Sequence, residues 1–318
     1  MNELFSRIQS AQRALTPYLD PTPLVRSVLL SRLTGCEVFL KCEHFQQTGS
    51  FKSRGATHKL LALGPDARAP GVITASTGNH GQGVAWAGKM LGVPVTVYVP
   101  ENVIRFKLDV MRELGAEVVL IPGDPLLGEL EARREAARRG VPYVAPYNDL
   151  DVVAGQGTAG LEMTAQCPDL DAIFVTVGGG GLISGIGTAF KSASPRTRVV
   201  GCWPVASAAM HRSLDAGHIV AVEETDTLSE SSTGNIEPGS VTFDICRSVI
   251  DDRILIDESE IRAAMRLLAE NERWMVEGAA GVAFAGLLKH AAANLGQKLA
   301  AVVCGRNIML DRFMEAVR

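Results

Sequence analysis

Short apolar runs alternate with longer helical patterns along almost the whole chain, and this alternation constrains the fold more than any other feature. The runs at 71–75 (GVITA), 95–99 (VTVYV), 117–121 (EVVLI) and 172–177 (AIFVTV) are each followed by a stretch with helical periodicity. Short apolar runs between helices are typical of parallel strands that are buried on both faces. The sequence therefore predicts an α/β fold with mainly parallel sheets flanked by helices.

The same pattern predicts how the chain is divided. Its length of 318 residues suggests about two domains. The strand–helix repeats between 71 and 148 predict a smaller domain of residues 71–148, with residues 1–70 and 149–318 together forming a larger one. Further strands are expected at 37–41, 198–202, 253–256 and 299–303, and helices at 80–91, 104–114 and 125–139.

Charge and composition exclude several classes of protein. The chain carries 31 Lys and Arg against 35 Asp and Glu, so it lacks the basic surplus of a nucleic-acid binder. It also has no apolar run long enough for a transmembrane helix, and its first residues predict an ordinary amphipathic helix. The six cysteines form no CxxC pair, which favours reduced thiols in a cytoplasmic protein. The charged run at 131–139 (EARREAARR) favours a solvated helix face with i,i+4 ion pairs over a partner-binding patch.

A glycine-rich turn follows the apolar run at 172–177. Residues 172–189 read AIFVTVGGGGLISGIGTA, so four glycines lead directly into a helix. Glycines allow an anion to approach the backbone, and the free N–H groups of a helix N-terminus point toward it. A tight turn that needs glycine is the plainer alternative. The dinucleotide-binding pattern G-x-G-x-x-G is not met, because Ile183 and Ser184 stand where its last glycine is required. The favoured ligand is therefore a single phosphate monoester.

Two further segments carry candidate chemistry. In 41–56 (KCEHFQQTGSFKSRGA), a Thr-Gly-Ser segment is expected to cap a helix and to place Lys52 in its first turn. The helix dipole and nearby cations would lower the pKa of this lysine, as Schiff-base chemistry requires, although any capped helix can carry a lysine. Residues 76–83 (STGNHGQG) predict a neutral cup for a carboxylate at a strand–helix turn. Here His80 is more simply explained as a packed structural residue than as a base.

These segments, together with TPLVRS at 22–27 and VCGRNI at 303–308, resemble the pyridoxal-phosphate-dependent serine/threonine ammonia-lyases (dehydratases) and serine racemases. The likeness covers nearly the whole chain. It implies the tryptophan-synthase-β-like fold type II, pyridoxal 5′-phosphate as cofactor, and a homodimer. Residues 1–70 and 149–318 would then bind the cofactor, and residues 71–148 the substrate. The EGAAG stretch at 277–281 and the GRNI ending are most similar to the hydroxyectoine-degradation dehydratase branch.

The resemblance also implies a role for each residue of the motifs. Lys52 would bind the cofactor aldehyde, Phe51 would pack near the ring, Asn79 would hold the 3′-oxygen, and Cys304 would face the pyridine nitrogen. The phosphate would be held by Gly178, Gly179, Gly180, Gly181 and Leu182. The substrate carboxylate would be held by Ser76, Thr77, Asn79 and His80. Residues 228–236 (LSESSTGNI) would lie beside the ring and the substrate side chain.

The implied reaction is β-elimination of water from a β-hydroxy amino acid. The amine of Lys52 would take the Cα proton, and the product would hydrolyse to a 2-oxo acid and ammonia. An amino-acid racemase is the alternative within the family, with Thr77 as the deciding residue. A pyridoxal-phosphate carrier or regulatory protein is the alternative outside catalysis. Serine, threonine, 3-hydroxyaspartate, phenylserine and a hydroxyectoine-derived amino acid all fit as substrates. No metal site is expected, because Trp203 and Ala209 stand where related racemases place acidic ligands.

Overall fold

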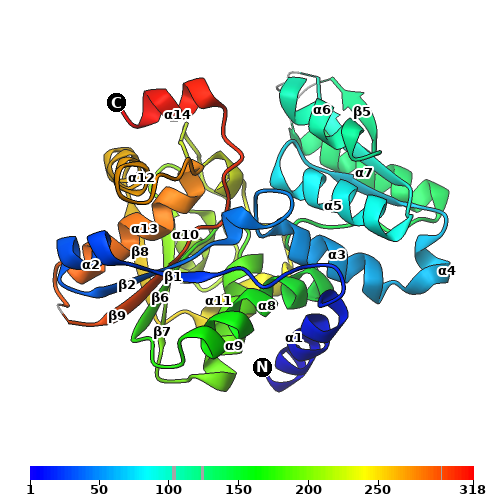
Figure 1. Cartoon of the computed structure of the whole chain (residues 1–318). Coiled ribbons are helices and arrows are strands. Elements are labelled where there is room, and N and C mark those ends of the chain that lie inside the picture. Colours follow the sequence, from blue (N-terminus) through cyan, green and yellow to red (C-terminus); the bar gives the residue numbers. More distant parts are fainter. Residues whose placement is uncertain (102–104, 123–124, 295) are drawn as a thin grey trace.

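The strands of the chain form two separate sheets in the computed structural model, which describes residues 1–101, 105–122, 125–294 and 296–318. The strands are β1 (Leu24–Ser27), β2 (Glu37–Lys41), β3 (Val72–Ala75), β4 (Val95–Pro100), β5 (Glu117–Ile121), β6 (Ala172–Thr176), β7 (Arg198–Pro204), β8 (Asp252–Ile256) and β9 (Lys298–Val302). A six-stranded sheet has the order β1-β2-β9-β6-β7-β8, and a three-stranded sheet has the order β3-β4-β5. Figure 1 shows the smaller sheet at the upper right and the larger one at the left.

The expected α/β class is confirmed, and β1 departs from the expected strand pattern. All described strand pairs are parallel except β1 and β2, which pair antiparallel with Leu24 opposite Lys41. Because β1 lies at the edge of the sheet and is only partly buried, it lacks the apolar run that marks the central strands.

Helices cover both faces of each sheet, and their bounds follow the chain. They are α1 (Asn2–Leu15), α2 (Val28–Thr34), α3 (Lys52–Ala62), α4 (Gly64–Arg68), α5 (Asn79–Leu91), α6 (Arg105–Glu113), α7 (Pro125–Arg139), α8 (Leu150–Gln166), α9 (Gly181–Ala193), α10 (Ala209–Ala216), α11 (Val241–Val249), α12 (Glu258–Glu272), α13 (Gly278–Ala291) and α14 (Leu310–Ala316), with short 3₁₀ turns η1 (Glu43–Phe45) and η2 (Glu230–Ser232). The helix expected over 104–114 corresponds to α6, and residue 104 lies outside the described residues.

Each sheet has its own apolar core. In the larger sheet α13 packs against β6 to β9, and α9 packs against β6 and β7. In the smaller sheet α5 and α6 cover one face while α7 covers the other, so neighbouring residues such as Val97 and Tyr98 pack into different clusters. The carboxyl ends of the parallel strands lead into loops and helix N-termini. Ligand sites in parallel sheets form at this edge.

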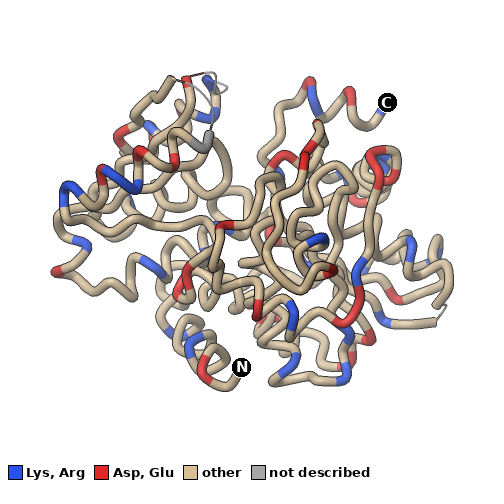
Figure 2. Tube along the Cα trace, turned by 180° about the vertical axis from the view of Figure 1, so that it is seen from behind, with Lys and Arg blue, Asp and Glu red and all other residues tan. Residues whose placement is uncertain are grey.

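Charged side chains are mixed in sign over the molecule. Figure 2 shows basic and acidic residues interspersed along the described part of the trace. Among the described residues, no helix combines the length and hydrophobicity needed to cross a bilayer.

Candidate active site

A cavity of about 530 Å³ brings together residues from distant parts of the sequence. Its lining includes Lys52 at the start of α3, the glycine turn between β6 and α9, and Cys304 after β9. Residues 231–238 and residues of α7 complete the wall. The structure thus unites the predicted Schiff-base lysine with the predicted phosphate turn, although about 125 residues separate them in the sequence.

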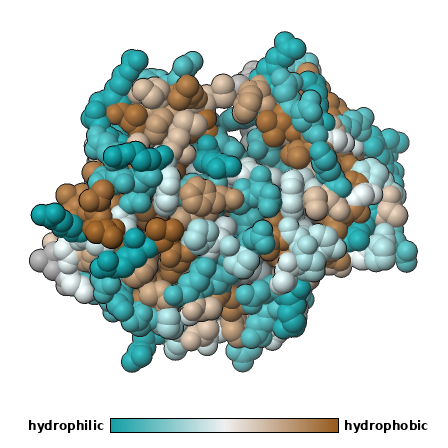
Figure 3. All heavy atoms as spheres, viewed as in Figure 1, coloured by the Kyte–Doolittle hydropathy of each residue, from teal (hydrophilic) through white to brown (hydrophobic). Residues whose placement is uncertain are grey.

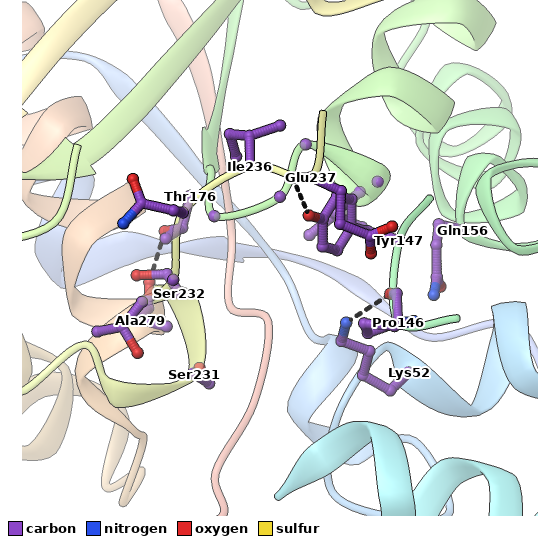
Figure 4. A pocket seen from close by; sticks show the side chains of 18 of the residues that line it. Lys52, Pro146, Tyr147, Gln156, Thr176, Ser231, Ser232, Ile236, Glu237 and Ala279 are labelled. Carbon is purple, nitrogen blue, oxygen red and sulfur yellow. Dashed lines mark hydrogen bonds between the residues drawn. The ribbon is translucent and has the colours of Figure 1, made fainter. Parts of the chain in front are cut away.

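Lys52 is the first residue of α3, and its side chain is held inside the cavity. Its Nζ donates a hydrogen bond to the Pro146 carbonyl oxygen at 2.9 Å, as Figure 4 shows. Burial lowers the pKa of the Lys52 amine to about 8, while Cys304 and Glu277 act in the opposite direction. The expected direction of the pKa shift is present, but its largest cause is burial, which the sequence did not predict, and the two neighbouring groups that contribute raise the pKa.

The expected cap of this helix was also wrong in detail. Phe51 occupies the N-cap position, and no side chain caps the helix. The Ser50 hydroxyl lies nearby and accepts from the Lys52 backbone N–H at 3.4 Å, a long contact. Backbone contacts fix this turn instead, because the Phe51 N–H donates to the Cys304 carbonyl at 3.0 Å. The helix start is therefore tied to the end of β9.

The glycine turn has no room for side chains. Gly180 has a φ of +84°, a conformation that glycine adopts without strain. A Cβ on Gly178 would lie 2.8 Å from the Ser232 carbonyl oxygen, and a Cβ on Gly179 would overlap the Tyr147 ring. The helix α9 starts at Gly181, so its free N–H groups lie beside this turn and favour an anion.

Cys304 lies in the same cavity and is fully buried. Burial and the nearby Glu277 carboxylate raise its pKa well above that of an ordinary thiol. The side chain is therefore a neutral thiol at physiological pH, which can hydrogen-bond to a ring nitrogen but carries no negative charge.

The predicted carboxylate cup lies beside a second cavity of about 460 Å³. Thr77 and Asn79 line this cavity, and Ser231 lines both cavities. Asn79 Nδ2 donates to Glu277 Oε2 at 2.9 Å, and its Oδ1 accepts from Asn307 Nδ2 at 2.6 Å. The amide of Asn79 is thus held in one orientation.

Ser76 and His80 lie in the same turn but outside the lining of these two cavities. The Ser76 hydroxyl accepts from the Gly78 N–H at 3.2 Å. His80 is buried, and its Nε2 lies 3.0 Å from the Val144 carbonyl oxygen. Burial lowers the pKa of His80 to about 3, so its imidazole is neutral at physiological pH.

Two residues of this region carried no functional signal in the sequence. Tyr147 packs against Gly179 and Gly181, and its segment contains no motif that predicts such a contact. Glu277 is buried, accepts hydrogen bonds from Asn79 and Ser231, and has a raised pKa because of its burial. The sequence marked it only as the first residue of the unusual EGAAG stretch.

Comparison with known proteins settles the family. The profile described as "Pyridoxal-phosphate dependent enzyme" matches residues 15–305. The chain belongs to the pyridoxal-phosphate dependent enzymes. This pyridoxal-phosphate enzyme is 38% identical over 322 residues to a putative threonine dehydratase of Sinorhizobium fredii, covering 100% of this chain and 97% of the relative. It is 31% identical to a serine racemase of Oryza sativa, covering 98% of this chain and 92% of the relative.

A solved structure gives the same result for the fold of the pyridoxal-phosphate enzyme. Threonine deaminase isoform 2 from Solanum lycopersicum superposes with a TM-score of 0.95 at 32% identity, covering 99% of this chain and 92% of that one. The expected fold type II architecture is therefore confirmed.

The residues of the cavity fit pyridoxal 5′-phosphate. The side-chain-free turn before α9 suits its phosphate, the buried amine of Lys52 suits its aldehyde, and the neutral thiol of Cys304 suits its ring nitrogen. When bound, the cofactor supplies an aldehyde for covalent attachment and a ring that withdraws electrons from the substrate Cα.

Proposed function

We propose that this pyridoxal-phosphate enzyme is an ammonia-lyase that removes water from a small β-hydroxy amino acid and releases a 2-oxo acid and ammonia. The observation that carries the proposal is the Lys52 amine, buried in one cavity with the glycine turn and Cys304. The names of relatives support the reaction type, since threonine dehydratase and threonine deaminase both describe this elimination.

Lys52, Pro146 and Cys304 have different roles in this reaction. With its pKa near 8, Lys52 has a substantial neutral fraction and can accept the Cα proton. The Pro146 carbonyl, 2.9 Å from Nζ, then accepts a hydrogen bond from the ammonium that results. Cys304 adds no charge at the ring nitrogen, so the ring withdraws electrons less strongly than it would beside a carboxylate. Weaker electron withdrawal would favour prompt loss of the β-hydroxyl over return of a proton to Cα.

The individual site residues are part of the same proposal. Lys52 and Thr77 are proposed as catalytic residues. Cofactor contacts are proposed for Lys52, Phe51, Asn79, Gly178, Gly179, Gly180, Gly181, Leu182 and Cys304. Substrate contacts are proposed for Ser76, Thr77, Asn79 and His80. The residues 71–148, which contain the three-stranded sheet, are proposed as the substrate-binding domain, with residues 1–70 and 149–318 as the cofactor-binding domain.

An amino-acid racemase is the second candidate, because the hydroxyl of Thr77 is retained beside the carboxylate turn and a serine racemase is among the relatives. Racemisation needs a proton donor on the cofactor face opposite Lys52. A threonine hydroxyl can supply that proton, but its β-branched side chain is restricted at χ1. Elimination is therefore proposed as the main reaction.

The test is release of 2-oxo acid from serine, threonine, 3-hydroxyaspartate, phenylserine and a hydroxyectoine-derived amino acid. Borohydride should fix the cofactor to the peptide that contains Lys52, as measured by mass spectrometry. Lys52→Ala should abolish both turnover and fixation, whereas Lys89→Ala on the exposed face of α5 should change neither. A colourless preparation that is active, or an active Lys52→Ala variant, would contradict the proposal.

We also propose a cytoplasmic homodimer. The six cysteines are all buried free thiols, which agrees with a reducing compartment. Val28, Leu29 and Leu33 of α2 are 68%, 52% and 61% exposed, and Figure 3 shows hydrophobic side chains gathered at the left of the view, over α2. Such a patch is typical of an association surface. Light scattering should give twice the mass of 33.8 kDa, and Leu29→Asp should shift it toward the monomer.

A further inference from the structure

One segment without a regular strand covers much of the cofactor cavity. All residues from 231 to 238 line it, and apart from the short turn η2 the segment is neither helix nor strand. A segment of this kind has few backbone hydrogen bonds of its own, so contacts with neighbouring elements must fix its position. Ser231, Gly234 and Asn235 form hydrogen bonds with Glu277, Glu224 and Val222 of the proposed larger domain. Glu237 adds contacts with α7 and with residues 147–148.

Glu237 forms three polar contacts with two other parts of the chain. Its Oε1 accepts from Arg133 Nη2 at 2.9 Å, and its Oε2 accepts from Asn148 Nδ2 at 2.9 Å. Its backbone N–H donates to the Tyr147 hydroxyl at 3.0 Å, a bond that Figure 4 shows. Both carboxylate oxygens and the main chain are therefore engaged.

Each of these partners is held in turn. Arg133 lies on α7, where its Nε donates to Glu129 at 3.0 Å and its guanidinium lies 4.3 Å from the centroid of the Tyr143 ring. The ring of Tyr147 packs over Gly179 of the phosphate turn. Glu237 consequently links the covering segment to a helix of the smaller sheet and to the wall of the phosphate turn.

Arg133 differs from the other arginines of its helix. The sequence favoured a solvated face for the run at 131–139, and Arg138, at 70% exposure, does pair within the helix with Glu135 at 2.6 Å. Arg133 is 38% exposed, lines the cofactor cavity and reaches Glu237, 104 residues away. Arg133 thus makes the expected i,i+4 pair with Glu129 and, in addition, a contact outside its helix that the sequence did not predict.

We propose that Glu237 is a positioning residue that holds residues 231–238 over the cofactor cavity, with Arg133 as its anchor on α7. Retention of the cofactor then depends on an ion pair with the smaller sheet. The proposal rests on membership of the pyridoxal-phosphate family, and it is independent of which amino acid is the substrate.

The test compares Glu237→Gln, Arg133→Gln and the double variant with Glu135→Gln as a matched control. Glu237→Gln retains a side-chain oxygen that can accept a hydrogen bond, but it removes the negative charge that pairs with Arg133. We expect a three- to tenfold increase, of about the size of one lost hydrogen bond, in the dissociation constant of pyridoxal phosphate from the apoprotein. The double variant should match the single variants, because both remove the same interaction. Glu135→Gln, which removes ion pairs with Arg138 and Arg139 inside the same helix, should leave cofactor affinity unchanged.

A second measurement separates positioning from general destabilisation. Amide hydrogen exchange within residues 231–238 of the apoprotein should accelerate in Glu237→Gln, while exchange in the core strands β6 and β9 stays unchanged. In the wild-type protein, salt at about 1 M, where screening is strong, should produce the same local acceleration.

Several outcomes would overturn the proposal. Unchanged cofactor affinity in Glu237→Gln would do so, as would full additivity in the double variant or uniform acceleration of exchange throughout the protein. Loss of the lyase assignment leaves these readouts intact, because none of them requires turnover.

Discussion

At the scale of single residues, the most informative group is the amine of Lys52. The amine is the reactive form toward an aldehyde, and burial lowers its pKa to about 8. We therefore expect the rate at which the apoenzyme binds pyridoxal phosphate covalently to rise with pH and to level off above about 8. Stopped-flow absorbance over a pH series measures this rate. A rate that keeps rising toward pH 10, as for an exposed lysine, would contradict the buried position.

Thr77 is the residue proposed to decide between elimination and racemisation. If its hydroxyl returns the proton on the face opposite Lys52, Thr77→Ala should lower the production of D-amino acid selectively. Thr77→Ser keeps the hydroxyl without the β-branch, so it should retain that side reaction or increase it. Chiral chromatography beside a 2-oxo-acid assay measures both rates. Accumulation of D-amino acid faster than 2-oxo acid in the wild-type enzyme would show that the racemase is the right assignment.

At the scale of elements, a buried ion cluster fixes the first turn of α3. Arg54 Nε donates to Glu43 at 2.7 Å and Arg54 Nη1 donates to Glu162 at 2.6 Å, while Lys41 also pairs with Glu162 at 2.6 Å. The four groups are almost fully buried, so two positive and two negative charges compensate one another away from water. The cluster joins α3 to β2, η1 and α8 two residues beyond Lys52.

Removing one charge from this cluster should be costly. Arg54→Met leaves two buried carboxylates against one lysine, and we expect a loss of about 3–5 kcal/mol in the free energy of unfolding. Arg26→Met removes an exposed ion pair with Glu37 and should cost about 0–1 kcal/mol. Urea denaturation of both variants measures the difference. Equal losses would mean that the cluster contributes no more than a surface pair.

At the scale of the whole molecule, Trp203 and Ala209 stand at the two positions for which the resemblance to a family predicts that no metal is bound. Trp203 at the end of β7 is fully buried, and Ala209 at the start of α10 is buried as well. Neither side chain offers the oxygen ligands that Mg²⁺ and Ca²⁺ require. We expect added Mg²⁺ or Ca²⁺ to leave kcat/KM unchanged in steady-state assays. Strong activation that a chelator reverses would contradict this expectation.

Local patterns in the sequence were sufficient for most of the elements and for the phosphate site, and the resemblance to a family supplied the cofactor. Apolar runs such as VTVYV and AIFVTV mark strands that are buried on both faces, because such strands need apolar residues at every position. The four glycines after β6 predict an anion site because backbone approach and positive φ leave few other residues possible. The same locality explains the misses. The edge strand β1 has no such run, and the pKa of Lys52 depends on burial by residues distant in the sequence.

Contacts between distant segments were decided only by the tertiary structure. Tyr147 packs on the glycine turn, and Glu277 holds Asn79 from 198 residues away. Arg133 pairs with Glu237 as well as with Glu129 of its own helix. No periodicity or motif encodes these pairs, because each depends on how two sheets and their connecting segments pack against one another. The sequence alone determined the fold class and, through the resemblance to a family, the cofactor and the lysine proposed to bind it. Packing determined which side chains enclose them.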